Sequence, residues 1–390
     1  MNFRTNFIIV LMLSGSICGF SQNVHAEDVF ADSIDVGIEQ QTKIENLVTQ
    51  LGSNQFASRE RAATALMQMG TPALAVLAKR EKSTEDPEVR DRISGLVKQI
   101  TESNTQAKID RFMAGQEVDF EGWNRFGELM GDTVTARELF VEVHLEHPDL
   151  LRSLGQDAKE LQRAMDIVDA KIQNRMFVKR QHPSRADTIA LLLPAFNPKV
   201  SFSPGYENTI VGVLDRLSAQ QMRRDPRLEP GLRSLIGSWV SRCTLAGRVE
   251  TLTKAMQWDV PEALPIAIST LSETDDMQTL VVSMQTIARF GDAKDSASLK
   301  NLLTDNRVTG EAGYGKQQLI QTQVRDVAIA TIAILNDVPL AEVGFPQAST
   351  HAMFGFTILG IGFPKSQEAN RNKSLLRIAE MISPTPTNGS

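Results

Sequence analysis

The spacing of apolar residues constrains this fold more than any other feature of the sequence. Apolar side chains recur at Ile44, Leu47, Val48 and Leu51, the i, i+3, i+4, i+7 pattern of an amphipathic helix, and Gly52 follows as a stop. Similar stripes with short links continue along most of the chain. No segment shows the sustained period-two alternation of a half-buried strand. The sequence therefore predicts an all-α fold.

Cap signals mark where several of these helices begin. Thr71-Pro72 and Asp86-Pro87 each place a capping side chain directly before a proline, the residue favoured at the first helical position. The paired carboxylates Asp275-Asp276 are expected to open a helix, because the helix dipole favours negative charge at that end. These signals predict short helices joined by short links.

An internal repeat relates two of the early helices. Arg59 and Ala62 return 31 residues later as Arg90 and Ile93, and the apolar positions that follow them stay in step. A period of roughly 30–50 residues in helix-pair units is typical of solenoids, in which neighbouring repeats bury each other's apolar faces. We therefore expect an α-solenoid built from stacked helix pairs.

The segment from Phe56 to Arg90 resembles HEAT repeats, and more particularly the HEAT-like units of exported bacterial proteins of unassigned function. The likeness to such proteins extends to residues 115–200 and to the end of the chain that begins at Val324. It implies stacked antiparallel helix pairs and, usually, protein binding without catalysis. The residues that carry the repeat signature are Arg59, Ala62, Leu66, Gly70, Asp86, Pro87, Val89, Arg90, Val324, Arg325 and Asp326.

The same patterns divide the chain into segments. A second helical array is expected over residues 205–340, with Leu264, Ile268 and Leu271 on one apolar stripe. Repeated Gly-Phe-Pro triplets at 344–346 and 362–364 predict a hairpin or an apolar loop that caps this array, and any strand is expected within residues 343–364. The full division is 1–26, a cleaved leader; 27–110, HEAT-like repeats; 111–204, non-repetitive helices; 205–340, the second array; 341–382, the capping element; and 383–390, a disordered tail.

The first 26 residues have the features of a signal peptide. Arg4 precedes a short apolar core, and small residues lead to a cleavage site between Ala26 and Glu27. The alternatives are an N-terminal membrane anchor, for which the core is short, and lipid modification of Cys18, for which Ile17 is a poor neighbour. We expect an exported protein, periplasmic or secreted, with no membrane span after cleavage. Cys243 then remains as the sole cysteine and is expected to be buried on an apolar stripe.

Composition excludes some classes of partner. The 390 residues are 42% hydrophobic and 23% charged, which is ordinary for a folded soluble protein. The formal net charge of −6 argues against nucleic-acid binding, which depends on a strong positive field.

Two patterns imitate functional sites. Residues 310–317 match a phosphate-binding loop through Lys316, but Gln317 replaces the Ser or Thr that would hold Mg²⁺, and the preceding segment is expected to be helical. His144 and His147 are spaced for one helix face, yet a zinc site needs a third protein ligand. We interpret them as solvated residues that close a helix before Pro148. No cofactor or metal site is expected.

Basic residues gather in two places, and a solvated face is the default interpretation of both. The alternative is a docking surface for an acidic partner. One group is Arg223, Arg224, Arg227 and Arg233; the other is Arg175, Lys179, Arg180 and Arg185.

These observations together predict a non-catalytic scaffold that binds a protein partner through a helical-repeat surface. The rival hypotheses are a structural envelope component that associates with itself, and an enzyme whose site is assembled from distant residues. The sequence leaves the partner's identity and the oligomeric state, including a homo-oligomer, open.

Overall fold

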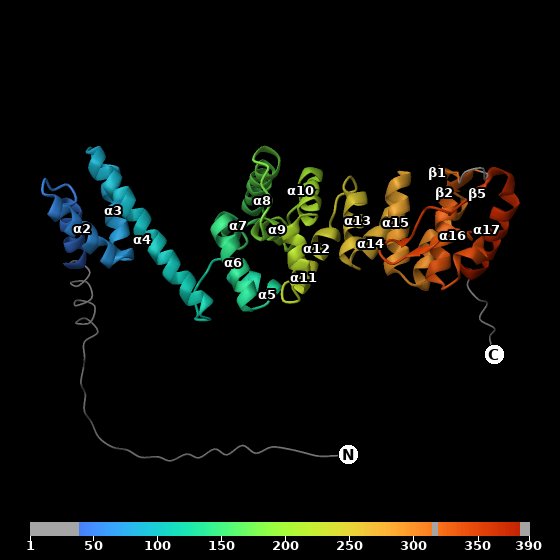
Figure 1. Cartoon of the computed structure of the whole chain (residues 1–390), viewed down its shortest axis with the longest axis horizontal. Coiled ribbons are helices and arrows are strands. Elements are labelled where there is room, and N and C mark those ends of the chain that lie inside the picture. The colour runs from blue at the N-terminus through green and yellow to red at the C-terminus, as the bar shows by residue number, and fades with distance from the viewer. Residues whose placement is uncertain (1–38, 314–318, 383–390) are drawn as a thin grey trace, which may run out of the picture. The chain divides into compact units, whose positions relative to one another are not determined.

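The computed structural model describes residues 39–313 and 319–382, and they are mostly helical (Figure 1). The all-α expectation is confirmed at that level. The chain divides into two compact units, Met1–Arg111 and Phe112–Ser390. The expected leader with its Ala26–Glu27 junction, Lys316 of the phosphate-loop-like segment, and the 383–390 tail lie outside the described residues.

The first unit is built from amphipathic helices around one apolar core. Its core includes Ile44, Leu51, Leu66, Leu77 and Ile93, all buried. The helices cover 39–50, α2 (Phe56–Met69), α3 (Thr71–Ser83) and α4 (Pro87–Met113), the last of which ends two residues beyond the unit. Asp86 caps α4 as expected, since its Oδ1 accepts from the Glu88 amide at 2.9 Å. Thr71 lies inside α3 instead of capping it, because Gly70 takes the N-cap position with a positive φ of 66°.

The 31-residue repeat has a structural counterpart in this unit. Arg59 Nη1 donates to the Ser53 carbonyl at 2.9 Å, and Arg90 Nη2 donates to the Thr84 carbonyl at 2.5 Å. Each arginine therefore bonds the carbonyl six residues before it, in the link that precedes its helix. The same signature at Arg325 behaves differently, since Arg325 Nε bonds Gln323 Oε1 and its Nη2 bonds Glu368.

The second unit continues with short helices that pack largely against their neighbours in the sequence. Figure 1 shows its elements following one another in chain order from α5 to α17. The elements up to the first strand are α5 (Trp123–Met130), α6 (Val134–Glu146), α7 (Pro148–Ser153), α8 (Ala158–Gln173), the π-helix η1 (Asn174–Val178), α9 (Arg185–Leu192), η2 (Leu193–Phe196), α10 (Pro204–Leu214), α11 (Leu217–Arg224), α12 (Glu229–Val240), α13 (Arg248–Trp258), α14 (Ala263–Glu273), α15 (Met277–Phe290) and η3 (Ala293–Thr304).

Strands occur outside the region where the sequence predicted them. The expectation that strand is confined to 343–364 is wrong, because β1 (Val308–Ala312) and β2 (Ile320–Gln323) pair antiparallel and β2 also pairs with β5 (Phe363–Pro364). The remaining elements are α16 (Val324–Leu335), η4 (Leu340–Val343), the hairpin strands β3 (Thr350–His351) and β4 (Gly355–Phe356), η5 (Lys365–Gln367) and α17 (Glu368–Ile382). The sequence predicted either a hairpin or an apolar loop in this region, and the β3–β4 hairpin agrees with the first of these. Helix α17 was not predicted.

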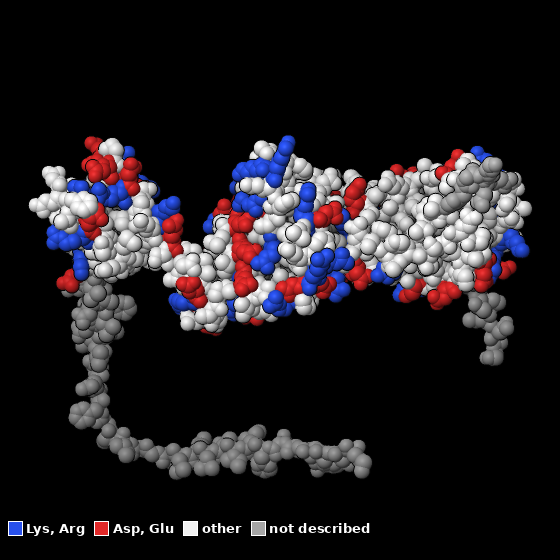
Figure 2. Space-filling view, in the orientation of Figure 1, with Lys and Arg blue, Asp and Glu red and all other residues white. Residues whose placement is uncertain are grey.

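The buried face of α14 also differs from the expected one. Ala263, Ala267 and Thr270 are buried, while the predicted stripe of Leu264, Ile268 and Leu271 is only half-buried. Small residues face inward because α14 packs against α15 and η3. Larger aliphatic side chains are thereby left partly on the surface, and Figure 2 shows that the visible face of this part of the unit carries few charged residues.

A buried ion pair joins the last helix to the rest of the unit. Arg371 Nε on α17 lies 2.9 Å from Asp326 Oδ1 on α16, and both side chains are buried. Asp326 Oδ2 also accepts from the Gln323 amide at 2.8 Å, which caps α16. Burial raises the pKa of Asp326, although the hydrogen bond from Arg371 opposes this.

Among residues 39–313 and 319–382, no helix is long and apolar enough to cross a bilayer.

Candidate functional site

His147 occupies the break between α6 and α7. Pro148 disfavours helical geometry in the residue before it, so α6 ends at Glu146 and α7 begins at Pro148. This break turns the His147 ring into the protein, where it is buried. The ring Nε2 lies 2.9 Å from Asp187 Oδ1. The expectation that His147 is a solvated helix-closing residue is therefore wrong.

Asp187 is held in place by the start of α9. Ser184 and Asp187 form a capping box in which the Asp187 amide donates to Ser184 Oγ at 3.1 Å and the Ser184 amide donates to Asp187 Oδ2 at 2.8 Å. The Asp187 side chain is 0% exposed. The local capping geometry thus fixes a carboxylate against a histidine that lies 40 residues away in the sequence.

Arg175 completes this group by bridging two carboxylates. Its Nη1 lies 2.5 Å from Asp187 Oδ2 and 2.9 Å from Glu146 Oε2. Ser184 Oγ lies 3.3 Å from the same Glu146 oxygen. We call Glu146, His147, Arg175, Ser184 and Asp187 the buried clasp, because it ties the end of α6 and the start of η1 to the start of α9.

The clasp keeps its carboxylate charged. Burial raises the pKa of Asp187, but the hydrogen bonds from His147 and the Ser184 amide, together with the Arg175 charge, outweigh it and lower that pKa. Burial likewise opposes the charge of Arg175, yet the hydrogen bond to Glu146 and the nearby carboxylates raise its pKa. The clasp is thus a network in which one guanidinium pairs with two carboxylates.

This geometry does not form a nucleophilic triad. In such a triad the serine hydroxyl bonds the histidine, and the histidine bonds the carboxylate through its other nitrogen. Here Ser184 Oγ bonds the Asp187 amide and Glu146, and His147 Nε2 bonds Asp187 directly. The serine is thus used for capping the helix.

The clasp does contain three side chains of the kind that bind metal ions. Ligand atoms of Glu146, His147 and Asp187 lie within 4.8 Å of one another. A divalent cation bound by all three, however, would lie beside the Arg175 guanidinium, which already forms an ion pair with each carboxylate. The residues present fit an internal ion-pair network better than a metal.

This assignment predicts how the chain responds to metal. Zn²⁺ or a chelator should leave the melting temperature of the parent chain unchanged to within about 1 °C, because metal that does not bind the folded state gives no stabilisation. In Arg175→Met the two carboxylates and His147 lose their resident cation, so Zn²⁺ should stabilise this variant. Thermal denaturation monitored by circular dichroism measures both effects. A melting temperature of the parent that falls with chelator would contradict the assignment.

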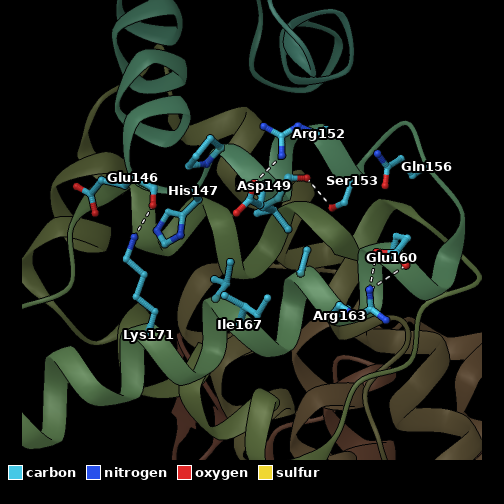
Figure 3. Close-up of a pocket in the computed structure, with 14 residues that line it drawn as sticks. Glu146, His147, Asp149, Arg152, Ser153, Gln156, Glu160, Arg163, Ile167 and Lys171 are labelled. Atoms are coloured by element: carbon cyan, nitrogen blue, oxygen red, sulfur yellow. Dashed lines mark hydrogen bonds and ion pairs between the residues drawn. The ribbon is translucent and has the colours of Figure 1, made fainter. Parts of the chain in front are cut away.

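A surface pocket of about 330 Å³ adjoins the clasp and lies between α7 and α8. Its apolar lining includes Leu150, Ile167 and Val168, and Ile167 is 56% exposed. Figure 3 shows charged side chains around this lining in mutual pairs: Arg152 with Asp149 and Arg163 with Glu160. Lys171 reaches back to the Glu146 carbonyl. The pocket thus combines an exposed aliphatic residue with charges of both signs.

The structure assigns distinct places to the other residues singled out from the sequence. His144 meets the Phe120 ring edge to face and stacks on the Phe140 ring. Cys243 is buried as expected, and burial raises the pKa of its thiol to about 11, with the Arg248 charge opposing. The helix expected before the 310–317 segment is confirmed as η3, and the strand β1 then runs into that segment as far as Ala312. A phosphate-binding loop leads into a helix, whereas this segment leads into β2.

The interpretation of both basic groups as solvated faces holds only in part. Arg175 is in the clasp and Arg185 pairs with Glu142, so these two are structural, whereas Lys179 and Arg180 are exposed. In the other group, Arg223 packs over the Trp258 ring and Arg227 pairs with Asp225.

Ser184 and Asp187 are residues of the clasp that the sequence analysis missed. The signal was present as Ser184-x-x-Asp187, a capping-box pattern that predicts a helix start. That pattern does not indicate which distant side chains the aspartate meets.

Comparisons of this chain with protein-family models, with curated proteins and with solved structures found no match.

Proposed function

We propose that this chain is an exported, non-catalytic scaffold that binds a protein partner across the surface of an α-solenoid. The observation that carries the proposal is the pocket between α7 and α8, where Ile167 is exposed within a ring of charges of both signs. An aliphatic contact surrounded by polar groups is the usual composition of a protein-binding surface. A charge ring of mixed sign suits a peptide backbone with its own charged side chains better than a single charged metabolite.

Two further observations support this proposal. The half-buried aliphatic residues of α14 lie in a part of the unit whose visible face has few charges, and depletion of charge is typical of the core of an interface. In addition, the side chains of the buried clasp form hydrogen bonds and ion pairs with one another. The buried clasp combines a histidine, a serine and carboxylates, as catalytic sites do, and these internal contacts favour a structural role for it.

The test uses a crosslinker placed in the pocket. A photoreactive amino acid at position 167 should give a specific partner crosslink in the exported fraction, and the same amino acid at position 145 should not. Leu145 is a matched control because it is 61% exposed and lies near the end of α6, yet it does not line the pocket. The partner crosslinked at position 167 is then purified, and its binding to the parent chain is measured directly.

The corresponding substitution should give the same result in this binding assay. Ile167→Asp should weaken partner binding by at least tenfold, because it places a charge at the apolar centre of the contact, where hot spots concentrate. Leu145→Asp should change binding less than threefold, and both variants should keep the parent's stability because both positions are exposed.

Crosslinks only between copies of the chain would favour self-association, and a turnover activity lost in His147→Ala would favour an enzyme. Either result would overturn the proposal.

A further inference from the structure

The turn after α8 presents apolar and basic side chains together on the surface. Residues 177–182 are all exposed, and Phe177 and Val178 are 71% and 72% exposed. Lys179 and Arg180 follow them directly, and no ion pair joins either to an acidic residue in the described parts of the chain. We call Phe177, Val178, Lys179 and Arg180 the basic tip.

The backbone of the tip is held in a fixed and unusual conformation. It leaves α8 through the π-helix η1, closed by a hydrogen bond from the Lys179 amide to the Asn174 carbonyl at 3.0 Å. Arg180 adopts a positive φ of 53°, which is uncommon for a residue with a side chain. Such local departures from helical geometry occur frequently at functional sites.

The buried clasp anchors the base of this tip. Arg175 belongs to η1 and is tied to Asp187 and Glu146, while Ser184 holds the chain where it returns into α9. A tip anchored at both ends loses little conformational freedom on binding. The clasp therefore holds the basic tip in one orientation.

Charge complementarity indicates what the tip binds. The segment from Asn174 to Ser184 contains no acidic residue, and Lys179 and Arg180 are its cations outside the clasp, although the whole chain has a net charge of −6. Figure 2 shows Lys and Arg side chains gathered over the part of the molecule that Figure 1 labels α8. A partner of this surface must be anionic and must also accept two adjacent apolar side chains.

We propose that the basic tip binds the surface of an anionic lipid bilayer, with Phe177 and Val178 entering the interface and Lys179 and Arg180 contacting lipid phosphates. Aromatic and aliphatic residues flanked by cations are the usual composition of peripheral membrane anchors. An acidic protein would need a preformed pocket for both apolar side chains, whereas a bilayer accommodates them without one. This interaction is separate from the α7–α8 pocket.

The experiment places a fluorescent reporter on the tip itself. Phe177→Trp is compared with Leu376→Trp, a matched control at a position on α17 that is 69% exposed. Both are mixed with vesicles of phosphatidylcholine containing phosphatidylglycerol and brominated lipid, and the three native tryptophans give a common background. The Phe177→Trp emission should be quenched and that of Leu376→Trp should not, and quenching should be lost on vesicles of phosphatidylcholine alone.

The cations are tested in the same reporter chain. Each Lys or Arg near an anionic surface contributes about fivefold to binding, so Lys179→Gln with Arg180→Gln should weaken vesicle binding by about 25-fold at low salt. Circular dichroism should show the parent's fold, because every changed residue is exposed. Equal quenching of both reporters, or none of either, would overturn the proposal. A shift of the Phe177→Trp emission by soluble polyglutamate without quenching by vesicles would also overturn it and identify an acidic polypeptide as the partner.

Discussion

Asp187→Ala should destabilise the second unit by about 3–5 kcal/mol, the cost expected when one member of a buried charge network is removed. The substitution leaves His147 without its 2.9 Å partner, takes a carboxylate from Arg175 and removes half of the capping box of α9. A loss of this size is a large part of the roughly 5–15 kcal/mol that stabilises a typical domain. Urea denaturation followed by circular dichroism measures it.

A nearby aspartate provides the matched control. Asp149 also forms an ion pair, with Arg152 at 2.6 Å, but its side chain is 73% exposed. Asp149→Ala should therefore change the free energy of unfolding by at most about 1 kcal/mol, as for other surface pairs. Equal losses in the two variants would mean that the buried clasp is not a stabilising network.

The contribution of Asp187 should also depend on pH in a defined direction. Its pKa is lowered in the folded chain, so the unfolded chain takes up a proton at a higher pH than the folded one. The stabilisation by Asp187 is then fully present above the unfolded pKa of about 4 and is lost as the pH falls through the folded pKa. The difference in stability between the parent and Asp187→Ala should be constant from pH 7 to about pH 5 and smaller below pH 4.

Arg371→Met should have a similarly large effect on the C-terminal end of the unit. It leaves Asp326 buried without its ion pair and removes the 3.2 Å hydrogen bond from Arg371 Nη2 to the Gln321 carbonyl of β2. We expect a loss of about 3–5 kcal/mol in the free energy of unfolding, measured by chemical denaturation. Arg377→Met is the control, because Arg377 lies on the same helix and its pair with Glu342 is exposed, so its loss should stay at or below about 1 kcal/mol.

A second substitution should rescue this variant. Asp326→Asn removes the buried charge but keeps an oxygen that accepts from the Gln323 amide, so the cap of α16 remains. The double variant Arg371→Met with Asp326→Asn should recover at least half of the loss, because the largest part of the cost is an uncompensated charge. No recovery would show that Arg371 acts through packing against Phe363, over whose ring its guanidinium lies at 5.3 Å.

Local signals in the sequence were sufficient for the helices and for many of their ends. Apolar periodicity predicted the all-α fold, Asp86 and Asp276 cap helices as their positions suggested, and Arg59 and Arg90 make equivalent hydrogen bonds 31 residues apart. All of these depend on residues within one or two helical turns of each other. Such interactions are encoded by spacing alone.

Tertiary packing decided which face of a helix is buried and which polar residues meet. The triplet Val89-Arg90-Asp91 recurs in the sequence as Val324-Arg325-Asp326. Asp91 is nevertheless exposed, whereas Asp326 is buried against Arg371, which lies 45 residues further along. Ala263 and Ala267 are the buried residues on α14, which packs against α15 and η3, and the predicted stripe of larger side chains is not. Strand β2 contains three polar residues and shows no apolar alternation, so its pairing depends on β1 and β5.

The buried clasp illustrates the same division between sequence and structure. The sequence determined that α6 ends before Pro148 and that Ser184 and Asp187 cap α9, because both effects are local. Only the packing of α6 against α9 brought His147 to Asp187 and placed Arg175 between two carboxylates. A side chain's own residue type and spacing do not specify its partner across a helix interface, since that partner depends on how whole helices pack.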